Sequence, residues 1–156
     1  MEIAGLPAHP LVVHAVVVLA PLGALVGLAY ALVPRWRWLL RWPLVVLAVA
    51  VAVVSVVAAQ AGEALADSRG LDSPALDDHE DLGELMRTWS LTFVVDAMLA
   101  AWALGGPSPL KSGRGAQESR GWIGWVAVTL LVAGAIGLGV VAALAGDSGA
   151  RMVWGS

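Results

Sequence analysis

The residues best suited to chemistry in this chain are its three histidines, His9, His14 and His79. The chain contains no cysteine. Disulfides, thiol catalysis, Cys-ligated iron–sulfur clusters and a covalently attached c-type haem are therefore excluded. Any metal ion or haem has to be held by histidine, carboxylate or methionine side chains.

His79 lies in the acidic sequence DDHEDLGE beside Glu80, and Glu63 lies one loop earlier in the chain. An imidazole with carboxylates suits zinc, iron or manganese, and exposure at the outer face would also allow copper. The sequence has no HExxH or HxH spacing that would make a site specific. Two interpretations follow: a metal site at His79, Glu80 and Glu63, or a solvated acidic loop that holds no metal.

His14 lies within the apolar sequence HPLVVHAVVVLAPLGALVGLAYALV. It is five residues from His9, about 140° around a helix, so a regular helix does not let both bind one ion. An imidazole in an apolar slot suits axial ligation of a b-type haem, with a second ligand such as His79. The alternative is a structural histidine that hydrogen-bonds Gln60, Thr88 or a backbone carbonyl.

Asp96 lies near the middle of another apolar segment. A carboxylate at the centre of a membrane helix costs about 2.5–3.5 kcal/mol on insertion scales, so it should face the bundle, be protonated or line a wet path. Asp96 is thus a candidate for proton or small-ion handling. The alternative is a neutral side chain that hydrogen-bonds Ser55 or Thr129.

The elements that must position these residues are membrane helices. The chain is 59% hydrophobic and 13% charged, far from the composition of a soluble domain. Residues 11–33 contain no charged residue, and about 23 helical residues span about 34 Å, enough to cross a bilayer. The N-terminal residues lack the basic region of a signal peptide, so we expect this helix to be retained.

The hydropathy pattern predicts one all-α domain over residues 1–156, an integral membrane four-helix bundle. Ser73 and Pro74 form a favourable helix start, so the third helix is expected to begin near residue 74, outside the membrane. The predicted spans are residues 11–33, 43–61, 85–104 and 122–145.

The positive charges predict an orientation with both termini outside. Three Lys or Arg residues lie in the first connector and three in the last, against two around the acidic segment. The positive-inside rule then places the acidic loop between helices 2 and 3 on the outer side of a bacterial inner membrane. The Arg and Trp residues of RWRWLLRWP are typical of an interfacial belt, and with a net charge of −3 nothing favours nucleic-acid binding.

Small residues at four-residue spacing predict close helix packing. One stripe comprises Gly23, Gly27 and Ala31, and the other comprises Ala135, Gly139 and Ala143. Such stripes suit packing against a neighbouring helix, and they also suggest association with a second copy or with a larger membrane complex.

Four segments carry a resemblance to a known family. They are GLPAHPLVVH, AGEALAD, DDHEDLGE and GDSGARMVWG. With these segments the chain resembles the bacterial "domain of unknown function 2231" family of four-helix membrane proteins. The resemblance implies that His9, His14, Glu63, His79 and Glu80 occupy recurrent polar positions, and that Asp147 stands where relatives often have histidine. A metal could accept Asp147 as a ligand, whereas a haem could not.

The resemblance also implies a link to redox modules. The leading hypothesis is a redox accessory component that holds haem b through His14 and His79, or a divalent metal ion through His9, His79, Glu63, Glu80 and Asp147. The alternatives are a structural subunit without cofactor and an ion pathway through Asp96. No nucleophile–base pair or phosphate loop is present, which argues against an enzyme.

Overall fold

The computed structural model describes residues 2–3, 6–70, 73–105 and 121–154. Its main elements are four long helices: α1 (Ala8–Leu32), α2 (Arg37–Arg69), α3 (Pro74–Ala103) and α4 (Gly121–Trp154). A 3-10 turn, η1 (Pro34–Trp36), joins α1 to α2. Two short strands, β1 (Glu2–Ile3) and β2 (Leu6–Pro7), pair antiparallel before α1.

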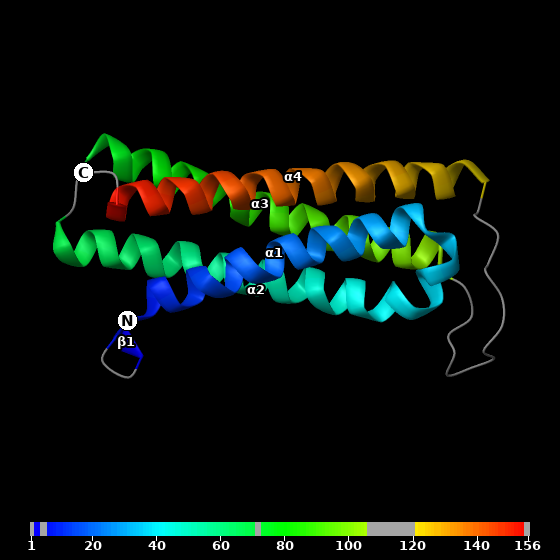
Figure 1. Cartoon of the computed structure of the whole chain (residues 1–156), viewed down its shortest axis with the longest axis horizontal. Helices are drawn as coiled ribbons and strands as arrows, with labels where there is room; N and C mark the ends of the chain where they lie inside the picture. Colours follow the sequence, from blue (N-terminus) through cyan, green and yellow to red (C-terminus); the bar gives the residue numbers. More distant parts are fainter. Residues whose placement is uncertain (1, 4–5, 71–72, 106–120, 155–156) are drawn as a thin grey trace.

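The helices form an antiparallel bundle in which each packs on the next and α4 closes on α1 (Figure 1). The start of α1, the turn between α2 and α3 and the end of α4 lie at one end of the bundle. The turn η1, the end of α3 and the start of α4 lie at the other end. The end of the bundle that holds the start of α1 and the end of α4 is called the terminal end below. The predicted all-α four-helix architecture is confirmed.

The helices α1, α2 and α4 are long and apolar enough to cross a membrane. The helix α3 is less apolar because it carries acidic residues in its first turns and Arg87 and Asp96 further along. The outer surface is rich in large apolar side chains, including Val18 and Val95, each 65% exposed. A soluble protein rarely exposes so many large apolar side chains, so these faces suit contact with lipid.

All four helices begin before the predicted spans, and α2 and α4 also end well beyond them. The helix α2 begins at Arg37 and continues through Pro43 to Arg69, where residues 43–61 were expected. The helix α4 continues to Trp154 and not to residue 145, and an ion pair between Asp147 and Arg151 (2.8 Å) lies on its added turns. Hydropathy marks where lipid ends, whereas a helix ends at a breaker or a cap.

The turn between α2 and α3 shows such a cap on each side. Gly70 ends α2 in the left-handed conformation (φ 57°), and its N–H donates to the Ala66 and Asp67 carbonyls. Ser73 begins α3, with its hydroxyl accepting a hydrogen bond from the Leu76 N–H (3.3 Å) and Pro74 in the first turn. The segment expected to be an acidic loop is therefore mostly helical and projects as a hairpin.

The first small-residue stripe lies inside the bundle, and the second does so only in part. Gly23 and Gly27 on α1 are buried and lie against Phe93, Leu138 and Ala135, so neighbouring helices occupy the first stripe as predicted. On α4 Ala135 is buried, whereas Ala143 is exposed. The buried part of the stripes therefore serves helix packing within one chain.

Arg37 stabilises the end of the bundle at which η1 joins α1 to α2. Its Nε donates to the Tyr30 carbonyl (3.0 Å), and its Nη2 donates to the Ala31 carbonyl (2.9 Å). These carbonyls belong to the last turn of α1, where no intrahelical donor is available. One arginine of the basic connector thus caps a helix, while Arg35 and Arg41 stack on Trp36 and Trp42.

We expect Gly27→Ala to destabilise the bundle and Gly139→Ala to leave its stability unchanged or raise it. A methyl group at Gly27 would lie 3.0 Å from Cζ of fully buried Phe93, whereas one at Gly139 meets only Ala24 Cβ at 3.8 Å. Overpacking costs about 1–3 kcal/mol, roughly 2–4 °C of melting temperature per kcal/mol. Thermal melts in detergent test this difference, and equal melting temperatures for the two variants would contradict it.

Candidate ligand-binding site

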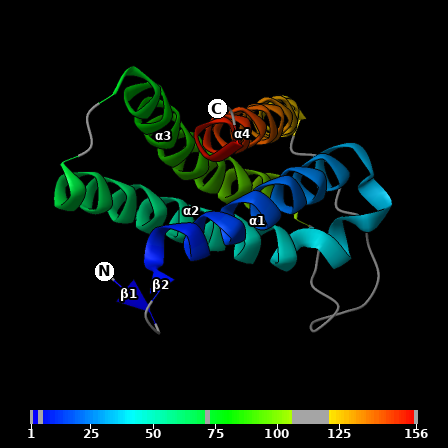
Figure 2. The same ribbon diagram turned by 60° about the vertical axis from the view of Figure 1, so that its left-hand side comes forward.

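A cavity of about 210 Å³ lies between the four helices near the terminal end. It is lined by the first turns of α1, the last turns of α2, the first turns of α3 and the late turns of α4. In this region α2 and α3 diverge from each other (Figure 2). The four helices pack closely at the bundle centre, and the cavity forms where they spread apart.

The polar lining comes mainly from α3 and α2. Five ionisable side chains line the cavity: His79, Glu80, Asp81 and Glu84 on α3 and Glu63 on α2. His79 and Glu80 are half-buried, whereas Glu63, Asp81 and Glu84 are exposed. The sequence thus identified three of these five side chains, and the fold brings them to one cavity.

Two glycines of α4 make room at this site. Gly146 lines the cavity, and Gly149 lies against the His79 ring, where a methyl group would be 3.2 Å from its Cε1. A larger side chain at position 149 would displace the imidazole. The glycines of the C-terminal GDSG sequence therefore leave space for the cavity and for the His79 ring. The sequence alone did not indicate this role.

The mouth of the cavity is electronegative. Glu84 forms an ion pair with Arg87 (3.1 Å), so the charge of this one carboxylate at the mouth is neutralised. Within the part of the chain that the structure describes, Glu63 and Glu80 have no ion-pair partner. An opening with uncompensated carboxylates favours cations.

The other predicted ligands lie elsewhere. His14 is exposed and does not line the cavity. Asp147 is exposed, bonds Arg151 and does not line it either. The side chain of His9 lies outside the described residues. Among the side chains that are described, no three His, Asp or Glu groups converge as they would around a metal ion.

Ser55 forms the inner end of the cavity and was not singled out as a ligand from the sequence. It is 2% exposed, and its Oγ has no hydrogen-bond partner within the described residues. A single serine in the apolar sequence of α2 resembles ordinary helix composition, so only the rotation of the helix shows that it faces a cavity. Ser55, one of the two partners considered for a neutral Asp96, does not hydrogen-bond that side chain.

Asp96 lies deeper in the bundle and is 7% exposed. Its Oδ2 contacts Gly134 on α4, where the absence of a side chain makes room for the carboxylate. Thr129, the other expected partner, is exposed. Asp96 therefore faces the bundle, as its cost in lipid requires.

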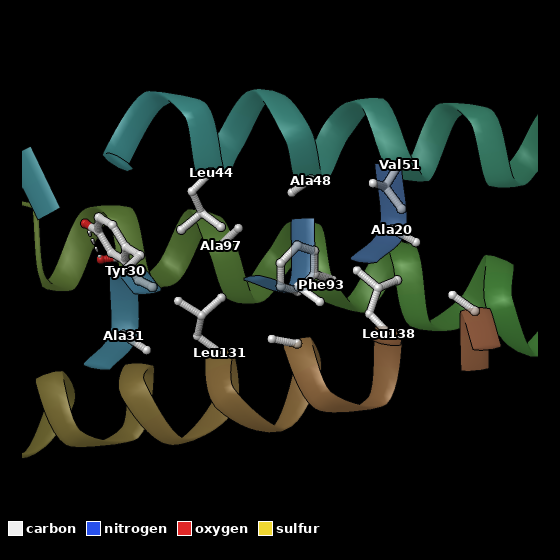
Figure 3. Packing of buried hydrophobic residues seen from close by; sticks show 14 of the residues in the cluster. Ala20, Tyr30, Ala31, Leu44, Ala48, Val51, Phe93, Ala97, Leu131 and Leu138 are labelled. Atoms are coloured by element: carbon white, nitrogen blue, oxygen red, sulfur yellow. Dashed lines mark hydrogen bonds between the residues drawn. The ribbon is translucent and has the colours of Figure 1, made fainter. Parts of the chain in front are cut away.

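The cavity does not extend to Asp96. Val51, Phe93 and Leu138, each at most 1% exposed, form a packed layer around Gly23 (Figure 3). Ser55 lies one helical turn from Val51 toward the cavity, and Asp96 lies about one turn from Phe93 on the other side. An ion path through Asp96 would require this layer to open.

These features define a multi-pass, all-α membrane protein with a small cavity at one end. A family model described as "Predicted membrane protein (DUF2231)" matches residues 5–156, so the chain belongs to this family. Comparisons with curated proteins and with solved structures found no match.

We expect Asp96→Asn to leave proton flux into proteoliposomes at the wild-type level. The reason is the packed layer that separates Asp96 from the cavity. Flux measured with an entrapped pH dye tests this, with exposed Asp78→Asn as the matched control. A loss of flux in the Asp96 variant alone would establish a proton path through this carboxylate.

Proposed function

We propose that this protein binds a divalent metal ion at the mouth of the cavity and acts as an accessory component of redox chemistry at the membrane. The proposed ligands are His79, Glu63 and Glu80. The observation that carries the proposal is that all three line a single cavity, although they come from two helices. Imidazole and carboxylate together suit zinc, iron or manganese.

Binding would require movement of the carboxylates, because the described ligands do not converge without a metal. Glu63 is exposed, so its flexible side chain can change rotamer without disturbing the core. Fixing glutamate side chains costs conformational entropy. We therefore propose a site of modest affinity that exchanges its metal.

A haem fits the cavity less well than a metal ion does. The volume of about 210 Å³ is below the roughly 300–1,000 Å³ of pockets that bury drug-sized ligands, and a haem is larger still. His14, the first proposed axial ligand, is exposed outside the cavity. The redox part of the proposal rests on the family resemblance and not on the geometry of the site.

We expect one Zn²⁺ or Mn²⁺ ion to bind per chain, and His79→Ala to weaken its affinity at least tenfold. Removing a ligand should cost at least as much as the 10–100-fold effect of losing an outer-shell partner. Equilibrium dialysis with elemental analysis of the purified protein measures both quantities.

His14→Ala is the matched control, because His14 does not line the cavity. It should bind metal as the wild type does. Absence of stoichiometric metal, or equal binding by the His79 and His14 variants, would exclude the proposed site. A Soret band in the absorption spectrum of the purified protein would show that the bound cofactor is haem and not a metal ion.

We also propose that the cavity faces the outer side of a bacterial inner membrane. The distribution of arginines supports this orientation through the positive-inside rule. The end of α2, the start of α3 with His79, the start of α1 and the end of α4 would then all lie on the outer face.

The absence of natural cysteines makes labelling of single cysteines a direct measurement of orientation. We expect Asp78→Cys to react with a membrane-impermeant maleimide in spheroplasts, and Ser112→Cys to react only after permeabilisation. The reverse pattern would invert the orientation. Reaction of both in intact spheroplasts would contradict placement of the α2–α3 turn and the last connector on opposite sides.

Association with a second copy or a larger complex remains a further proposal. The small-residue stripes are largely buried within the chain, so the apolar outer faces of the helices would have to supply the contact.

A further inference from the structure

The feature that the metal proposal leaves unexplained is the Ser55 hydroxyl. Other helical hydroxyls bond to a carbonyl in the preceding turn: Ser90 to Arg87 (2.8 Å) and Thr92 to Thr88 (3.0 Å). Ser55 is as buried as Ser90, yet its Oγ has no hydrogen-bond partner among the described residues and lines the cavity. A buried hydroxyl without a partner is costly, so a ligand with a hydrogen-bonding group would be stabilised there.

The surroundings of Ser55 restrict the ligand. Val16, Ala58 and Met86 form apolar walls at this depth, so a charged group would lose its hydration without compensation. Ser55 lies eight residues from Glu63 along α2, which places it about 12 Å deeper than the acidic mouth. The inner part of the cavity therefore suits a neutral, compact ring that carries a hydrogen-bond acceptor.

The source of such a ligand is the bilayer. Val17 lines the cavity, lies near Gly146 of α4 and is 46% exposed, so the cavity reaches the surface of the bundle beside α1 and α4. A lipid-soluble ring with its tail in the hydrocarbon could occupy it without passing through water.

We propose that the inner cavity binds the ring of a membrane quinone, with the Ser55 hydroxyl donating to one ring carbonyl. A para-quinone is neutral and flat and carries acceptor oxygens on opposite sides of the ring. One oxygen reaches Ser55 at the dry end, and the other faces the end that His79 lines. This inference goes beyond the metal proposal, because ring binding requires Ser55 and the apolar walls and does not require a metal.

The test uses the purified full-length protein in detergent with a chelator and decylubiquinone as the probe. We expect saturable binding of one quinone per chain by equilibrium dialysis against protein-free micelles. Ser55→Ala should weaken binding about tenfold, the effect of one good hydrogen bond. Ser90→Ala should change it less than twofold, because this equally buried serine already bonds Arg87 and does not line the cavity.

Two further measurements separate the possible outcomes. Decylbenzene, which has the same tail and no carbonyl, should not compete; equal competition would show a site for acyl chains and overturn the proposal. No saturable binding, or equal affinity of Ser55→Ala and wild type, would overturn it too and leave a buried water as the partner of Ser55. Glu80→Gln should retain quinone binding, so loss of metal binding and loss of quinone binding are distinguishable.

Discussion

The structure depends on close packing of α1 against α4 at the centre of the bundle. Lipid is as apolar as a leucine side chain, so burial of apolar surface supplies little attraction between membrane helices, and tight van der Waals contact has to replace it. Gly23 and Gly27 provide this contact because they let α1 approach Leu138 and Ala135 of α4, and they also make room for Phe93 of α3. Each later feature follows from where this contact begins and ends.

The cavity lies toward the terminal end from this contact. Ala135 is buried, whereas Ala143, two turns later on α4, is exposed, and beyond it Gly146 lies near Val17 of α1 and lines the cavity. The diverging turns of α2 and α3 leave a space that apolar side chains line and do not fill. A bundle with equally close packing along its whole length would have no such cavity, and the residues of DDHEDLGE would lie on an ordinary solvated surface.

Sequence reasoning predicted the elements well and the inward-facing residues only in part. Ser73 and Pro74 mark a helix start through their own chemistry, so the beginning of α3 could be read locally. The ends of α2 and α4 could not be read from hydropathy, because these helices continue past their apolar segments to Arg69 and Trp154. His79 was identified because its neighbours are acidic. That Ser55 lines the cavity and His14 does not depends on helix rotations that packing sets.

The two polar regions of the bundle, Asp96 and the cavity at the terminal end, differ in whether a proton or a ligand can reach them from outside. Asp96 lies against Gly134 beneath the layer of Val51, Phe93 and Leu138, and this layer has no polar side chain that could relay a proton. The carboxylates around His79 open toward water, and the Ser55 hydroxyl lies at the dry end of the same cavity. Within this one cavity the polarity falls from a charged mouth to a single neutral hydroxyl. A molecule bound there can keep its charged or hydrated part at the mouth and bury only a neutral part, which is the arrangement that a ligand arriving from the bilayer surface requires.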